Sequence, residues 1–89
     1  MGLLQQNPEI DAAQLRDDVL LFSSKTNKFY MMNATAAFVW ENLSAPASEE
    51  DLAERMCANF EGVEPAQALD DVRQTLQMML ERGLIVEAR

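Results

Sequence analysis

The spacing of the apolar residues changes once along this chain, near residue 33. Before that point, residues 19–22 (VLLF) and 28–32 (KFYMM) are short runs typical of β-strands. The segment between them is polar and ends in Asn27, a residue that tolerates a left-handed backbone. The two runs therefore predict a hairpin with a loop of about five residues. Residues 10–16 are a candidate for a strand ahead of this hairpin.

After residue 33 the apolar residues follow the period of a helix. Asn33 is a good N-cap for a first helix over residues 34–43, whose apolar face is Ala36, Val39, Trp40 and Leu43. Residues 48–51 (SEED) have the form of a capping box and predict a second helix, which carries Leu52, Met56 and Phe60 on one face. Pro65 suits the first turn of a third helix, and Gly83 suits its end. The buried stripe predicted for this helix is Leu69, Val72, Leu76, Met79 and Leu80.

This order predicts a small α+β domain in which a two- or three-stranded antiparallel sheet at the N-terminus is followed by three helices. A winged helix is the nearest general shape, although here the strands precede the helices. The length of 89 residues fits a single domain, 1–89, and Pro8 is expected to start an ordered core of about residues 8–86.

The composition excludes several classes of site. The chain has no His and one Cys, Cys57, which excludes most catalytic dyads, a structural zinc site and an intrachain disulfide. We therefore expect no cofactor, no metal and no enzymatic activity, with Cys57 a buried thiol. The net charge of −8 argues against nucleic acid, whose phosphates require clustered Lys and Arg. The chain shows no signal peptide and no apolar run of membrane-spanning length, so we expect a cytoplasmic protein without a membrane partner.

The acidic residues are unevenly distributed along the chain. Residues 41–71 contain nine acidic residues and one basic residue, whereas residues 1–40 contain four and three. One interpretation is a solvated face that maintains solubility. The other is a docking face for a basic patch on a partner.

From Asp18 onward the chain resembles the PqqD-like family, also called RiPP precursor peptide recognition elements. Residues 28–33 are similar to the family pattern k-y-y-x-L-N, with Met32 in place of the usual Leu. Other matching segments, in chain order, are Ala34-Thr35-Ala36 with Trp40, residues 48–53 (SEEDLA), Val72, Leu76, and residues 80–85 (LERGLI). The resemblance covers about residues 10–86, and the order and spacing of these segments make it fairly specific.

The resemblance implies a non-catalytic module that binds the leader segment of a ribosomally made precursor peptide and presents it to a modifying enzyme, such as a radical SAM enzyme, a peptidase or a cyclase. The leader would add as an antiparallel strand to the strand at 28–32, in a groove beside the third helix. The family pattern turns Tyr30 and Met32 toward the helices, and Arg73 could meet an acidic residue of the leader. The expected peptide-binding residues are Lys28, Phe29, Tyr30, Met31, Met32, Leu69, Asp70, Arg73, Leu76, Gln77 and Leu80.

Other interpretations of the same residues stay open. A strand rich in Met and aromatic residues is, taken alone, more often plain core. A homodimer could use the same strand edge. A winged-helix regulatory or interaction domain fits the shape, but the second helix carries Glu49, Glu50, Asp51 and Glu54 where a DNA reader needs basic or amide side chains. An acyl-carrier-like domain would also be small and acidic, but Asn42-Leu43-Ser44 lacks its Asp-Ser-Leu pattern.

Overall fold

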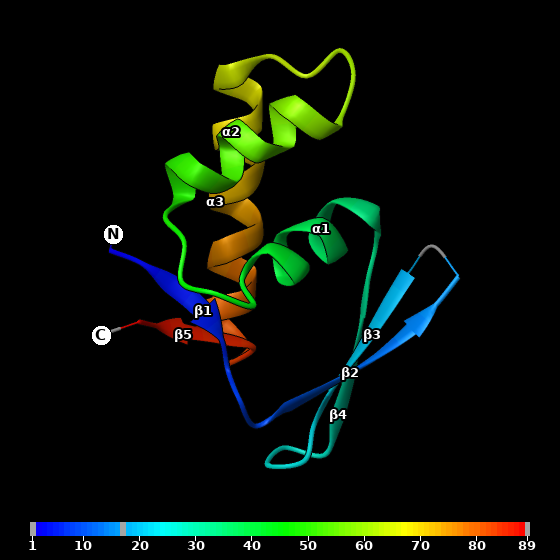
Figure 1. The fold of residues 1–89 in the computed structure, drawn as a ribbon. Coiled ribbons are helices and arrows are strands. Elements are labelled where there is room, and N and C mark those ends of the chain that lie inside the picture. The colour runs from blue at the N-terminus through cyan, green and yellow to red at the C-terminus, as the bar shows by residue number, and fades with distance from the viewer. Residues whose placement is uncertain (1, 17, 89) are drawn as a thin grey trace.

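The computed structural model describes residues 2–16 and 18–88. The strands Leu4–Gln6 (β1), Ile10–Leu15 (β2), Asp18–Ser23 (β3) and Lys28–Met32 (β4) come first. The helices Ala34–Asn42 (α1), Glu49–Asn59 (α2) and Pro65–Glu81 (α3) follow, and the strand Ile85–Glu87 (β5) comes last. The helices stack together, with the strands below them in Figure 1. The predicted α+β order, an N-terminal antiparallel sheet followed by three helices, is confirmed.

The larger sheet has the order β2-β3-β4, so β3 is central and the other two strands are its edges. All its pairings are antiparallel, and the β3–β4 register places Val19 opposite Met32 and Leu21 opposite Tyr30. Asn27, in the loop between these strands, has φ of +57°, the left-handed conformation expected for it. The predicted hairpin is therefore confirmed.

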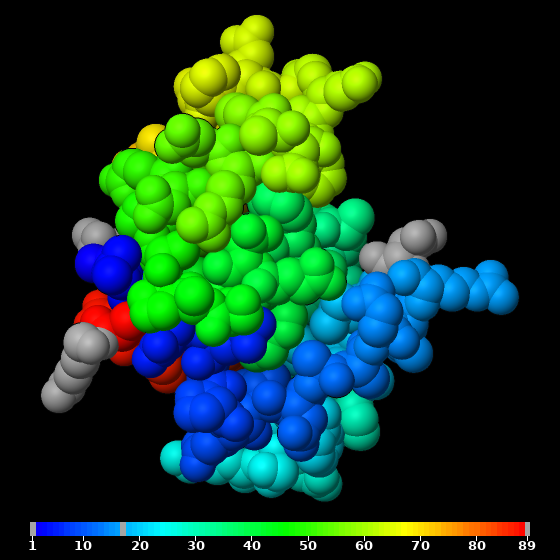
Figure 2. Space-filling view, viewed as in Figure 1, coloured from blue at the N-terminus to red at the C-terminus, as the bar shows by residue number. Residues whose placement is uncertain are grey.

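A second sheet joins the two ends of the chain. β1 pairs antiparallel with β5, and Leu4 is fully buried. Leu4 also exchanges two backbone hydrogen bonds with Ala47, of 2.9 and 3.0 Å. Figure 2 shows β1 lying against β5 and against the segment that follows α1. The expected start of the core at about residue 8 was therefore too late: the chain is already buried at Leu4.

The helix ends follow the capping pattern that the sequence predicts. The Asn33 side-chain oxygen accepts a hydrogen bond from the Ala36 N–H at 2.9 Å. Ser48 and Asp51 form the complete capping box at the start of α2. Pro65 is the first residue of α3, and Gly83, with φ of +69°, follows its C-cap. These local signals fix where α1, α2 and α3 begin and where α3 ends.

One apolar core joins the helices to both sheets. Its members include Leu21 and Met32 from the larger sheet, Trp40 from α1, and Leu76 from α3. Trp40 is 4% exposed, which confirms its expected place in the core, whereas Cys57 is only half-buried. None of the helices in the described residues has the length and hydropathy needed to span a membrane.

Candidate functional site

β4 is an edge strand with one free side. Among the described strands only β3 pairs with it. In an antiparallel strand, alternate residues direct their N–H and C=O groups away from the neighbouring strand. β4 contains no Pro, so each of its residues keeps an N–H group. The outer side of β4 can therefore accept a further strand, as the resemblance implied.

The two faces of β4 differ in burial. Met32 is buried and Tyr30 half-buried on the face toward the helices, as expected. Phe29 and Met31 point to the opposite face, where they are 64% and 57% exposed. The Phe29 ring lies 4.6 Å from the ring of Phe22 on β3, measured between centroids. Phe29 and Met31 can therefore offer backbone groups at the edge, but their side chains face away from the helices.

A hollow lies between the end of β4, the start of α1, and α3. It has a volume of about 350 Å³ and is lined by Asn33, Thr35, Ala36, Asp71, Gln74, Thr75 and Met78. One turn after Met78, the guanidinium carbon of Arg82 lies 5.5 Å from the centre of the Tyr30 ring, within cation–π range. We call this hollow, together with the neighbouring Tyr30–Arg82 contact, the β4–α3 cleft. Asn33, α1 and α3 line the hollow itself, and β4 borders the cleft through Tyr30.

The α3 residues predicted from the sequence lie outside this cleft. Leu76 is fully buried in the core and offers no surface to a peptide. Arg73 faces α2, where its Nε donates to Glu49 Oε1 at 3.0 Å, so its charge already has a partner within the chain. Leu69 lies beside α2 and Leu80 is half-buried against the core. Asp70 and Gln77 are exposed and bond to their helical neighbours Gln74 and Glu81.

The α3 residues that do border the cleft were missed. Asp71, Thr75, Met78 and Arg82 recur at i, i+4, i+7 and i+11, so they form one flank of the helix. The predicted residues Leu69, Arg73 and Leu80 form the opposite flank of the same buried stripe. Helical periodicity finds both flanks equally well, and it carries no signal for which of them faces β4.

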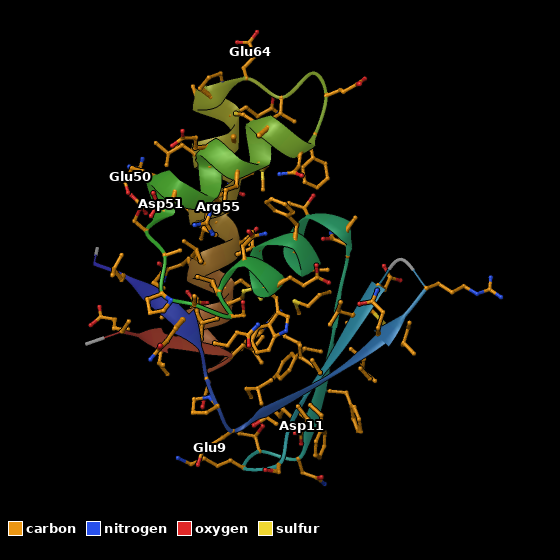
Figure 3. All side chains as sticks on the ribbon, viewed as in Figure 1. Glu9, Asp11, Glu50, Asp51, Arg55 and Glu64 are labelled. Atoms are coloured by element: carbon orange, nitrogen blue, oxygen red, sulfur yellow. The ribbon has the colours of Figure 1, made fainter. Side chains whose placement is uncertain are left out.

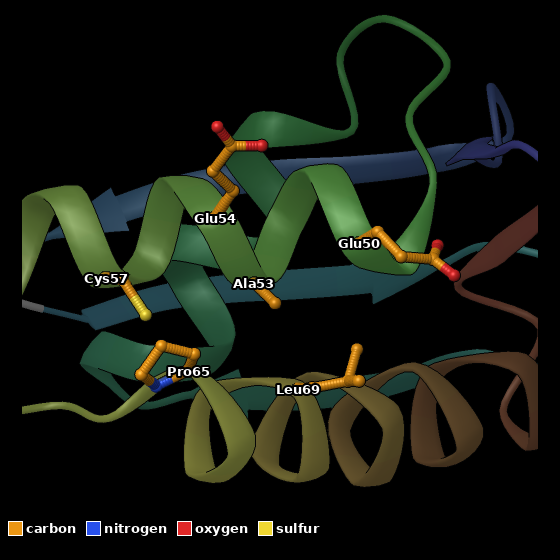
Figure 4. Close-up of a pocket in the computed structure, with 6 residues that line it drawn as sticks. All are labelled: Glu50, Ala53, Glu54, Cys57, Pro65 and Leu69. Carbon is orange, nitrogen blue, oxygen red and sulfur yellow. The ribbon is translucent and has the colours of Figure 1, made fainter.

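A second hollow lies on the other flank of α3. Its volume is about 290 Å³, and Figure 4 shows Ala53 and Cys57 of α2 turned toward Pro65 and Leu69 of α3, with Glu50 and Glu54 at its rim. This pocket has apolar walls but no strand edge. The residues that the structure describes include no group of three or more His, Cys, Asp or Glu side chains placed to hold a metal ion.

Comparison with known proteins identifies one family. The model of the family described as coenzyme PQQ synthesis protein D (PqqD) matches residues 18–85. A search of curated proteins found no significant match.

Three solved structures share the fold. TbiB1 in complex with the TbiA(beta) leader peptide has a TM-score of 0.85 at 19% identity, over 96% of this chain and 98% of that one. Lasso peptide synthetase B1 complexed with the leader peptide has a TM-score of 0.81 at 25% identity, over 93% and 96%. A heterocyclase in complex with substrate and cofactor has a TM-score of 0.67 at 18% identity, and there the match covers 98% of this chain but 11% of the heterocyclase. The same fold therefore occurs both in small chains and as a small part of a large one.

Proposed function

Because this chain belongs to the PqqD family, we propose that it binds the leader segment of a ribosomally synthesised precursor peptide and presents that peptide to a modifying enzyme. The observation that carries the proposal is the free edge of β4 beside the β4–α3 cleft. The leader adds as a fourth strand to the β2-β3-β4 sheet. Its backbone bonds to β4, and its alternate side chains enter the cleft.

The arrangement of the sheet favours β4 over the other edge strand. β2 is also an edge, but its residues after Ile10 are exposed. β4 has α3 beside it, with Tyr30, Met78 and Arg82 available to contact a bound side chain. Backbone bonds alone give affinity without selectivity, whereas a wall of side chains adds selectivity. Lasso peptide synthetase B1, at 25% identity, also binds a leader peptide.

The complex of this chain with the leader peptide binds a modifying enzyme. That enzyme is a radical SAM enzyme, a peptidase or a cyclase. The heterocyclase neighbour supports an enzyme partner, since there this fold is part of the enzyme chain itself. This chain acts as a binding module and not as the catalyst. The absence of His from its sequence supports that role, because His is the commonest general base.

The test is binding of a synthetic peptide with the leader sequence of the precursor encoded beside this protein, measured by calorimetry. Wild type should bind with micromolar affinity or better. Met31→Pro, which alters the backbone at the free edge, should weaken binding by about tenfold or more. Met31→Ala removes the same exposed side chain but keeps the N–H, so its affinity should stay near that of wild type. Ala12→Pro places the same change on the free side of β2, because Ala12 lies opposite Leu21 and Leu21 lies opposite Tyr30, and it should also leave binding intact.

A second measurement leaves the protein unchanged. The leader peptide is N-methylated at alternate residues, in two complementary versions, so that each version loses half of its backbone donors. Strand addition requires one version to lose binding and the other to keep most of it, because only alternate N–H groups face β4. Equal affinity of both versions, together with full affinity of a folded Met31→Pro variant, would exclude strand addition.

Self-association through the same edge is the competing use of β4. Exposed Phe29 and Met31 beside a free edge are features of strands that pair between copies. Sedimentation with and without the leader peptide separates the two uses. A dimer that the leader dissociates would show that both compete for β4, whereas a dimer unaffected by the leader would place self-association elsewhere.

A further inference from the structure

The two ends of the β4–α3 cleft carry opposite charge. At the end where β4 begins, Lys28 lies on the same face as Tyr30 and Met32, because side chains alternate along a strand. Arg82, which follows the last residue of α3, lies over the ring of Tyr30, the middle residue of β4. The neighbouring Glu81 accepts a hydrogen bond from Gln77, one turn earlier on α3. This end of the cleft therefore presents two cations, Lys28 and Arg82.

The other end, where β4 runs into α1, carries an acidic residue. Asp71 is half-buried there among Asn33, Thr35 and Thr75. Within residues 2–16 and 18–88 the only ion pair joins Arg73 to Glu49, so Asp71 has no basic partner in this part of the chain. The three residues around Asp71 are uncharged. A cationic side chain would meet both the carboxylate and these hydrogen-bonding groups at this end.

The distance between the two charged ends of the cleft matches the length of a short strand. Asp71 and Arg82 are eleven positions apart on α3, or about 16 Å at 1.5 Å per residue. An extended strand covers about 13 Å from its first residue to its fifth and about 17 Å to its sixth. A leader segment of five or six residues therefore reaches from one end of the cleft to the other. Between the ends, the half-buried Tyr30 and Met78 form an apolar middle.

The direction of the leader follows from the sheet. All pairings in the sheet are antiparallel, and antiparallel pairing is slightly the more stable per residue. A leader antiparallel to β4 enters beside Asp71 and Asn33 and leaves beside Lys28. We propose that the cleft selects leaders with the pattern basic–x–apolar–x–acidic, read from N- to C-terminus, in which the three named side chains face the cleft. This inference rests on the proposed function and adds the class of peptide recognised.

The test uses two nine-residue peptides of identical composition, Ser-Thr-Lys-Thr-Leu-Thr-Glu-Thr-Ser (forward) and Ser-Thr-Glu-Thr-Leu-Thr-Lys-Thr-Ser (reversed), both with blocked ends. Their equal net charge removes any general attraction to this acidic protein. Affinity is measured by NMR titration. The forward peptide should bind at least fivefold more tightly at low salt, and the difference should shrink at about 0.5 M salt, where the Debye length is a few ångströms.

The charge swap Asp71→Lys with Arg82→Glu should reverse the preference between the two peptides. The matched control is Glu50→Lys with Arg55→Glu, an equal exchange on α2, where Figure 3 labels both residues. The control should keep the forward preference. Equal affinities for the two peptides, or a preference that survives the swap in the cleft, would overturn the proposal.

The outcomes also separate this inference from the proposed function. If forward and reversed peptides bind equally and Met31→Pro weakens both, strand addition stands and charge selection fails. If neither designed peptide binds but the natural leader does, charge selection by this pattern also fails while leader binding stands. If neither the designed peptides nor the natural leader binds, both proposals fail.

Discussion

The two flanks of α3 border the same buried stripe but face different parts of the molecule. One flank, with Leu69 and Arg73, packs against α2, and there the Arg73–Glu49 ion pair spans the two helices. The other flank, with Asp71 and Met78, borders the β4–α3 cleft together with the start of α1. Both flank the same fully buried stripe of Val72 and Leu76. Under the proposed function, stability and recognition are therefore separated around one helix: one flank packs against α2, and the other is left to bind the leader.

With this separation, the proposed binding site would use none of the residues of the core. The buried stripe and the α2 flank hold the helices together, while the polar and half-buried residues of the cleft contribute less to packing. Substitutions on the buried stripe and the α2 flank should therefore change the free energy of unfolding, and substitutions on the cleft flank should change leader affinity.

The largest effect is expected in the buried stripe. Leu76→Ala should lower the free energy of unfolding by about 2–5 kcal/mol, because Leu76 is fully buried and its truncation leaves a cavity. Urea denaturation followed by circular dichroism measures the loss. A loss below about 1 kcal/mol would contradict the placement of Leu76 in the core.

The next effect compares two half-buried apolar residues on opposite flanks. Met78→Ala should weaken leader binding by about 1.4 kcal/mol, or tenfold, because it removes an apolar contact in the cleft. Leu69→Ala is the matched control, since Leu69 is half-buried on the α2 flank. Leu69→Ala should lose more stability than Met78→Ala, and only Met78→Ala should lose affinity. Equal losses of affinity would mean that the leader does not distinguish the flanks.

A smaller effect is expected from the ion pair on the α2 flank. Glu49→Gln should lower the free energy of unfolding by less than about 1 kcal/mol, because the Arg73 side chain is 56% exposed and water screens the pair. Leader affinity should not change. Asp71→Asn should do the reverse, with little change in stability and a change in leader affinity that diminishes with salt. Thermal melts and calorimetry on the same two variants test both statements.

The smallest effect is expected from the thiol on the α2 side. Cys57→Ser should leave leader affinity within about twofold of wild type, since the pocket that Cys57 lines lies on the far flank from the cleft. Alkylation of Cys57 in the wild-type protein should also leave affinity unchanged. Loss of binding after alkylation, with no loss in a Cys57→Ser variant treated in the same way, would show that the two flanks communicate.

The sequence predicted those features whose causes are local. Asn33 and the Ser48 capping box mark helix starts through contacts three residues away, and Asn27 marks a turn through its own backbone preference. The strand at 28–32 and the face that carries Tyr30 follow from alternation combined with the family pattern. These signals needed no knowledge of the rest of the fold.

Features that depend on distant partners were not visible in this way. The pairing of Leu4 with Glu87 joins residues at opposite ends of the chain. A three-residue strand is also too short to show a recognisable alternation of apolar and polar residues. The cleft flank of α3 was missed for a related reason. The sequence does not distinguish the two flanks of a buried helical stripe. Which flank faces β4 and which faces α2 depends on where those elements lie in the folded chain. Local hydrogen bonding and periodicity thus specify the helices and strands, whereas the packing of all these elements against one another decides which surfaces stay exposed.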